Sequence, residues 1–185
     1  MALTKLNFGG NQQALVAANI PTLTNTQLPT ISSAKMPTDS VLQVKSVDSH
    51  AQQNFNDTTW TVATGLTIDF TCSSTSNKVL ILCNIQGYKN NDTDGSAFFT
   101  GVYAASTRIL TNNGYYMRGA ADTGGYATVS NSLLYSPNST SQITYAVYCR
   151  SGDGNNYVLN PTNSGGTPNS NDSTTSSFTI MEIKG

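Results

Sequence analysis

From Ser40 onward the chain consists of short runs in which apolar and polar residues alternate, and each run ends in a cluster of small polar residues. A period of two is typical of β-strands that bury one face. The pattern predicts strands at residues 41–47, 58–62, 66–72, 78–88, 97–103, 107–110, 126–135, 142–150 and 176–183, and a short apolar stretch at 157–159. Residues 78–88 are mostly apolar, which predicts a central strand buried on both faces. Short strands in this number predict an all-β fold, an antiparallel β-sandwich of the jelly-roll type.

Residues 1–38 lack this alternation and contain an apolar-Pro-Thr unit, which recurs three times at a spacing of eight, with its prolines at Pro21, Pro29 and Pro37. Proline fixes its own φ and pushes the preceding residue toward extended geometry, so this segment is expected to be extended. A disordered leader fits the composition. A shaft in which several chains wind together also fits, and the regular apolar spacing favours it. The only helix expected here is a short one at residues 11–18.

The chain is therefore expected to have two parts, an extended N-terminal segment of residues 1–38 and a β-sandwich head of residues 39–185. An extended segment cannot bury its apolar side chains against itself, whereas three copies related by cyclic symmetry bury them against one another. We therefore expect a homotrimer. The apolar side chains expected in this shaft are Leu6, Phe8, Leu15, Ile20, Leu23, Leu28, Ile31 and Met36.

Composition narrows the classes of function. Of the 185 residues, 75 are Thr, Ser, Asn or Gln, and Glu182 is the only glutamate. The net charge is −1 and there is no basic run, so nucleic-acid binding is not expected. The longest apolar run, residues 79–83, is far shorter than the roughly 20 residues of a membrane span, and the first residues lack the apolar core of a signal peptide. Three cysteines without a CxxC pair, Cys72, Cys83 and Cys149, are expected to be buried free thiols, as fits a reducing cytoplasm.

The sequence offers little catalytic chemistry. A serine or cysteine nucleophile needs a base, and the only histidine, His50, falls in a polar loop with no Gx(S/C)xG motif in the chain. All aspartates except Asp69 lie in turn-like clusters, where Asp bonds the backbone. Neither metal-ligand spacing nor a phosphate-binding glycine loop is present. We expect no enzymatic activity, no metal and no cofactor.

Aromatic residues fall into two groups. The first group lies in apolar strand-like runs and is expected in the core: Trp60, Phe70, Tyr145 and Phe178. The second group accompanies glycines, asparagines and charged residues in segments without a clean strand pattern. Tyrosine supplies flat apolar area and a hydroxyl at little entropic cost, so such segments suit a carbohydrate- or protein-binding surface, and equally a subunit interface. The predicted surface comprises Tyr115, Tyr116, Arg118, Asp122, Tyr126, Asp153, Asn156 and Tyr157.

Three stretches carry a resemblance to a known family. Residues 36–44, MPTDSVLQV, resemble the "LP-x-GSVLQV" start of small tail-fibre-like proteins of marine and cyanobacterial phages. Residues 64–68 and 73–81, TGLTI and SSTSNKVLI, are similar to a hairpin of that family, "TGL-x-I" followed by "SSSNKILI". Residues 177–183, SFTIMEI, resemble its closing "LTLMEI" strand. The resemblance covers residues 36–185 and implies a trimeric head with a jelly roll like those of tumour necrosis factor or C1q, at the end of a virion fibre.

The expected function is that of a non-enzymatic phage structural protein in the virion, assembled in the host cytoplasm. As a short tail fibre or tail-tip protein, it would dock on other virion proteins through its N-terminus and bind a host-surface glycan or protein with its head. A capsid decoration or head-fibre protein shares all these sequence features, and the segment before the head is short for a fibre. A cellular lectin-like secreted domain is a third class, which would require a signal peptide.

Overall fold

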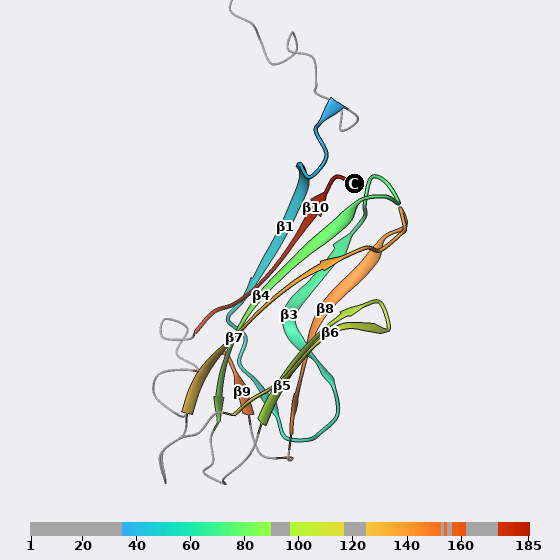
Figure 1. Ribbon diagram of the computed structural model, residues 1–185. Coiled ribbons are helices and arrows are strands. Elements are labelled where there is room, and N and C mark those ends of the chain that lie inside the picture. The colour runs from blue at the N-terminus through green and yellow to red at the C-terminus, as the bar shows by residue number, and fades with distance from the viewer. Residues whose placement is uncertain (1–34, 90–96, 117–124, 153, 155–156, 162–173) are drawn as a thin grey trace, which may run out of the picture. The chain divides into compact units, whose positions relative to one another are not determined.

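The computed structural model describes residues 35–89, 97–116, 125–152, 154, 157–161 and 174–185 (Figure 1). Contacts between Cα atoms divide the chain into two units, Met1–Lys35 and Met36–Gly185, so the second unit begins three residues before the predicted boundary. Met36, predicted as a shaft residue, lies in this second unit, where its carbonyl accepts a hydrogen bond from Lys184 Nζ. The remaining predicted shaft residues and the predicted helix lie outside the described residues: Leu6, Phe8, Leu15, Ile20, Leu23, Leu28, Ile31 and residues 11–18.

The described part of the second unit is all-β, as predicted. Its strands are β1 (Val41–Ser49), β2 (Gln53–Phe55), β3 (Thr61–Phe70), β4 (Lys78–Lys89), β5 (Ala97–Ala104), β6 (Thr107–Tyr116), β7 (Gly125–Tyr135), β8 (Ile143–Ser151), β9 (Tyr157–Leu159) and β10 (Ser176–Ile183). The alternating runs of the sequence thus correspond to strands along almost the whole unit.

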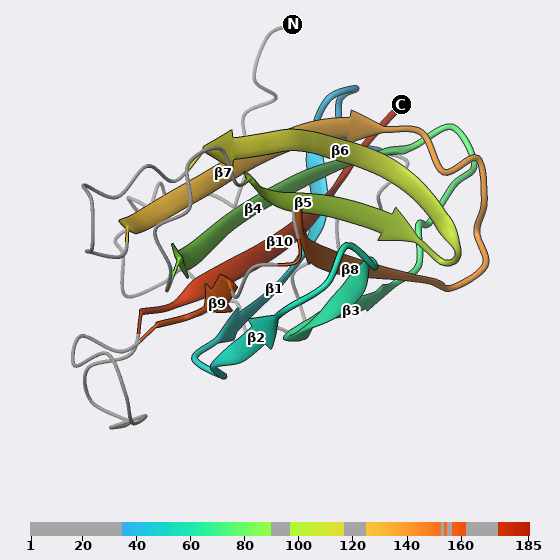
Figure 2. The ribbon, with the colours of Figure 1, turned by 90° about the horizontal axis from the view of Figure 1, so that it is seen from below.

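The eight long strands pair in a nested order. The hairpin β5–β6 lies innermost, β4 pairs with β7, β3 pairs with β8, and β1 pairs with β10, all antiparallel. A long hairpin that rolls up in this way gives a jelly roll, with β1-β10-β4-β7 in one sheet and β3-β8-β5-β6 in the other. Figure 2 shows the two layers. The predicted antiparallel jelly-roll sandwich is confirmed.

The two short strands extend the first sheet at one end. The pairing of β10 with β4 ends at the residue pair Ser177 and Asn84. Beyond it, β9 pairs with the same edge of β4, from Gly87 to Lys89. β2 pairs with β9 and closes this extension.

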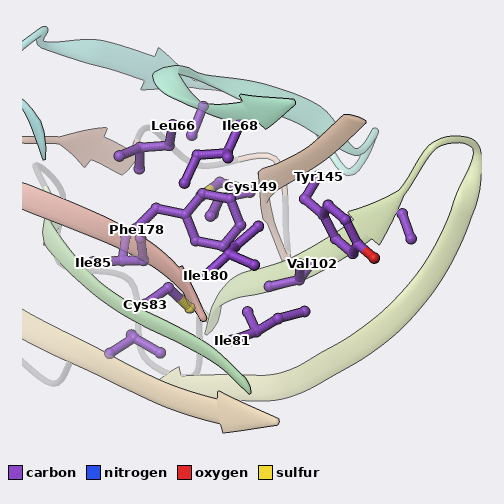
Figure 3. Packing of buried hydrophobic residues seen from close by; sticks show 14 of the residues in the cluster. Leu66, Ile68, Ile81, Cys83, Ile85, Val102, Tyr145, Cys149, Phe178 and Ile180 are labelled. Atoms are coloured by element: carbon purple, nitrogen blue, oxygen red, sulfur yellow. The ribbon is translucent and has the colours of Figure 1, made fainter. Parts of the chain in front are cut away.

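The core lies between the two sheets and is built from alternate residues of the long strands (Figure 3). Both sheets contribute fully buried side chains from alternating positions, as the period of two requires. They include Leu66, Ile68, Ile81, Ile85, Val102, Tyr145, Val147, Phe178 and Ile180. Three of the four aromatic residues predicted for the core are confirmed there: Phe70, Tyr145 and Phe178.

One pair of predicted strands forms a single strand. Residues 58–62 and 66–72 were expected as two strands, but β3 runs unbroken over 61–70 with an irregular register between Val62 and Thr67. Ala63 and Leu66, three positions apart, are both buried, so the bulge shifts the alternation by one residue. Gly65 occupies this bulge with φ of 81°, a left-handed conformation that glycine adopts at little cost. The bulge interrupts the alternation of apolar and polar residues, so the sequence pattern predicts a break between two strands where the structure has one continuous strand.

Candidate functional site

The predicted receptor segments are bracketed by strand ends that meet at one end of the sandwich. In β4, Lys78 pairs with Ile183 of β10, whereas Lys89 at the other end pairs with Gly125 and Tyr157. The chain enters the head beside Lys184, whose carbonyl accepts a hydrogen bond from the Asp39 amide. The strand ends around the predicted segments therefore lie opposite the end where β1 begins and β10 ends (Figure 1).

Tyr115 and Tyr116, predicted to lie in a loop, belong to a strand, and Tyr126 lies in the strand that was predicted over residues 126–135. Tyr115 and Tyr116 pair with Phe98 and Ala97 at the end of β6, and Tyr126 pairs with Tyr88 near the start of β7. The hairpin strands are longer than the sequence pattern indicated. The other predicted contacts of these segments lie outside the described residues: Arg118, Asp122, Asp153 and Asn156.

The predicted role of Tyr157 as a surface stacking residue is corrected. Its side chain is fully buried, and its ring stacks on Phe98 with centroids 5.4 Å apart. Phe55 packs edge-on against the same Phe98 ring at 6.1 Å. The short strand β9 is buried at all three positions, so Tyr157 belongs to the core. A sugar cannot stack on a ring that has no exposed area.

The outer face of the sheet β1-β10-β4-β7 carries an apolar row. Val44, Met181, Leu80 and Leu134 are neighbours across the four strands in the pairing register. Val44 and Leu134 are each 53% exposed, and Leu82 extends the row along β4 at 36%. The prediction that β4 is buried on both faces is therefore wrong for the single chain, because only its inward face is covered.

The outer face of the other sheet carries an aromatic cluster that sequence reasoning missed. Trp60, predicted for the core, precedes β3 and is only partly buried. A Cβ atom placed on Gly101 of β5 would lie 3.3 Å from the Trp60 ring, so the indole rests directly on the backbone of this glycine. Tyr103 contacts the Trp60 ring edge-on at 6.3 Å and packs against Tyr148 at 4.2 Å. The core assignment of Trp60 is thus corrected.

Two arginines complete this cluster. The guanidinium of Arg150 lies 4.1 Å from the Phe99 ring centroid and 5.2 Å from that of Trp60, and that of Arg108 lies 5.3 Å from the Trp60 ring. We call the six residues Trp60, Phe99, Tyr103, Arg108, Tyr148 and Arg150 the arginine–aromatic face. Sequence reasoning missed this surface because Arg108 and Arg150 lie far apart in the sequence. Only the pairing of β5, β6 and β8 shows that the two arginines share one sheet face.

Glu182, the only glutamate, has a structural site at the opposite end of the head. Its Oε1 accepts hydrogen bonds from the Ser73 amide at 2.6 Å, the Ser73 hydroxyl at 2.8 Å and Asn77 Nδ2 at 2.6 Å. Its Oε2 accepts one from Gln43 Nε2 at 2.6 Å. Burial alone would raise the pKa of this carboxyl group, but the hydrogen bonds outweigh it and lower the pKa below the ordinary 4.5.

Within the described residues, His50 and the three cysteines lie in different environments. His50 is exposed, and its Nδ1 shares a hydrogen bond of 3.0 Å with the Thr175 hydroxyl. All three cysteines are buried free thiols, as predicted. Across the described ranges, no three His, Cys, Asp or Glu side chains come together as metal ligands. Nor does any helix in that part of the chain have the length and apolarity to span a membrane.

No protein-family model and no curated protein matches the chain. Among solved structures, it is similar to the VP2 subviral particle of infectious bursal disease virus, with a TM-score of 0.44 and 11% identity over 85% of this chain. It is also similar to a structure of the Gx strain of that virus, with a TM-score of 0.42 and 12% identity over 85% of this chain. The match spans 38% and 37% of the length of those chains.

Proposed function

We propose that this chain is a non-enzymatic structural protein of a phage particle, a short tail fibre or tail-tip protein whose jelly-roll head binds the host surface. The observation that carries the proposal is the meeting of the three stretches that resemble small phage tail-fibre-like proteins. Gln43 from the first stretch, Ser73 and Asn77 from the second, and Glu182 from the third form one hydrogen-bonded network. The three stretches thus meet at one place in the head, which supports the proposal.

The two ends of the head are proposed to have different roles, attachment to the particle at one end and host binding at the other. The chain enters the head at the end where β10 finishes, since the Asp39 amide donates to the Lys184 carbonyl and the Lys184 amide donates to the Ser40 carbonyl. The opposite end holds the strand ends that bracket the predicted receptor segments. An N-terminal anchor on the virion would therefore point that opposite end toward the host, where binding residues are usefully placed on loops.

A homotrimer is part of the proposal, and the apolar row supports it. Exposed Val44 and Leu134, with Leu82 beside them, make an apolar strip on the outer sheet face, and exposed apolar strips can mark association sites. We propose that two further copies of this chain cover the strip in a closed cyclic assembly. The predicted double burial of β4 would then be restored in the assembly.

Electron micrographs of intact particles carrying a gold-labelled antibody against the head test the location. Label at the tail end is the expected result. Label distributed over the capsid would replace the tail role by that of a capsid decoration or head-fibre protein, and particles without label would overturn the virion assignment.

Deletion of residues 2–35 tests the anchoring role of the N-terminal segment. The shortened protein should keep the β-sheet circular dichroism of the head, because the second unit begins at Met36. It should fail to enter particles. Normal incorporation would place the docking surface on the head.

Light scattering tests the trimer, with an expected mass of three times the 19.6 kDa chain. Val44→Lys combined with Leu134→Lys should yield monomers, because six buried ammonium groups would face one another across the assembly. Thr107→Lys is the matched control, because Thr107 is exposed at the start of β6 and outside the apolar row. A wild-type monomer, or a doubly substituted trimer, would contradict the proposed interface.

A further inference from the structure

We propose that the arginine–aromatic face binds an acidic saccharide, one that carries uronic acid carboxylates. This inference rests on the proposed host-binding function and names the ligand class and the surface that takes it. The face lies on the outer side of β3-β8-β5-β6, away from the apolar row on the other sheet.

The sheet presents the Trp60 ring in a fixed position. Gly101 pairs with Tyr148 of β8 and Thr111 of β6, so the position under the indole is the middle of the sheet. A Cβ there would lie 3.1 Å from the Leu110 carbonyl oxygen and 3.3 Å from the ring, so a side chain would push the indole outward by a few tenths of an ångström. The partly exposed rings of Trp60, Tyr103 and Tyr148 together offer apolar area, against which the C–H face of a sugar can pack.

Two guanidinium groups, from the strands on either side of β5, lie over the Trp60 ring. Arg108 lies on β6 and Arg150 on β8, and both guanidinium groups lie near the Trp60 ring. One nitrogen of Arg150 donates to the Ser151 carbonyl at 3.3 Å, while its Nε is buried with no acceptor among the described residues. Within the same part of the chain, no carboxylate lies within salt-bridge distance of either arginine.

This combination selects an acidic saccharide. Arginine binds carboxylates in a bidentate manner, and a guanidinium held against aromatic rings is partly desolvated and strengthens its hold on an anion. A neutral sugar would use the rings and leave both charges uncompensated. A nucleic acid would need a longer basic track than two arginines in a chain of net charge −1.

Binding is measured on the full-length protein with hexagalacturonate as the probe and maltohexaose as the neutral control. Trp60 is the only tryptophan, so its fluorescence reports on this face alone. Hexagalacturonate should change the emission saturably, and binding should weaken with added salt. Arg108→Gln and Arg150→Gln should each weaken binding about tenfold, the loss expected when one charge-assisted contact is removed. Lys35→Gln removes an exposed charge outside the face and should leave binding unchanged.

The outcomes separate the proposal from simpler alternatives. Equal binding of maltohexaose, absence of saturable binding, or equal losses in all three variants would overturn the assignment. Retained melting temperatures in both arginine variants would show that the loss of binding is not a loss of folding.

Adsorption of particles to host cells distinguishes this inference from the proposed function. Three kinds of particle are compared: wild type, particles carrying the double arginine variant, and particles lacking the protein. If only those lacking the protein fail to adsorb, the host-binding role stands and this face is not the site. If particles lacking the protein adsorb normally, the host-binding function itself is wrong. Loss of adsorption in the double variant supports both.

Discussion

Replacing Glu182 by Gln should destabilise the head by about 2–3 kcal/mol at pH 7. The half-buried Gln43 amide would lose an acceptor, and the amide nitrogen of the new side chain, at a buried position, would find none; an unpaired buried donor costs about 1–3 kcal/mol. Gln43 cannot simply turn its amide over, because the same Nε2 also donates to the Thr71 carbonyl at 2.6 Å. The bonds at Oε1 would survive as weaker neutral bonds, and relief of carboxylate desolvation offsets part of the loss.

Thermal unfolding at fixed protein concentration measures the effect. For a domain of this size, about 2–3 kcal/mol corresponds to a decrease of roughly 5–10 °C in Tm. Asp69→Asn is the matched control, an acid-to-amide change at an exposed carboxylate whose Oδ1 accepts one hydrogen bond, from the Thr144 hydroxyl at 2.5 Å. Its expected effect is within about 0.5 kcal/mol of wild type.

The pH dependence identifies the cause. The folded-state pKa of Glu182 lies below its ordinary value of 4.5. The contribution of the carboxylate to the stability of the head is therefore complete above pH 4.5 and is lost as the pH falls through the folded-state pKa. The difference in stability between wild type and Glu182→Gln should therefore shrink as the solution is acidified below pH 4.5. A constant difference from pH 7 to pH 3, or a difference below about 0.5 kcal/mol at pH 7, would refute the role given to the carboxylate.

Three further predictions concern Tyr157, Gly65 and the three thiols. Tyr157→Ala should lower the free energy of unfolding by about 3–4 kcal/mol in a urea titration, because it empties the space beside Phe98; an effect within 0.5 kcal/mol would contradict its burial. Gly65→Ala should cost about 2 kcal/mol in the same assay, because φ is 81° and the new Cβ would lie 2.9 Å from Ser49 Oγ; unchanged stability would show that the bulge is not strained by a side chain. The three thiols should resist a disulfide reagent at pH 8 in the native protein and react fully in denaturant, since burial raises all three pKa values, that of Cys72 to about 11; rapid native labelling would contradict this.

The strands could be predicted from the sequence because each long strand buries one face. Phe178, Ile180 and Glu182 alternate with half-buried neighbours, and this alternation is visible without any structure. The period of two fails where the backbone leaves ideal pairing. The bulge at Gly65 split β3 into two predicted strands, and the three-residue strand β2 was too short to show any period.

The binding surfaces could be predicted only in part. The sequence shows tyrosines near glycines, but it does not reveal whether such a segment is a loop or the continuation of a strand. Nor does it show that the Tyr157 side chain points inward against Phe98. The strand-like run around Trp60 predicts a place in the core, whereas its place outside the sheet depends on Gly101, some forty residues later. Long-range pairing of this kind has no local signal.

The nested pairing of the jelly roll has a consequence for synthesis. Of the ten strands, β10 leaves the ribosome latest, yet it lies inside its sheet between β1 and β4. Until β10 is synthesised, β1 has no partner in its sheet, and Gln43 lacks its hydrogen-bond acceptor, the Glu182 carboxylate, which lies 139 positions later in the chain. Such non-local closure makes folding slow and leaves open edges during translation. A chain that stops before Ser176 therefore cannot close its head, so only chains translated through β10 can reach the folded state.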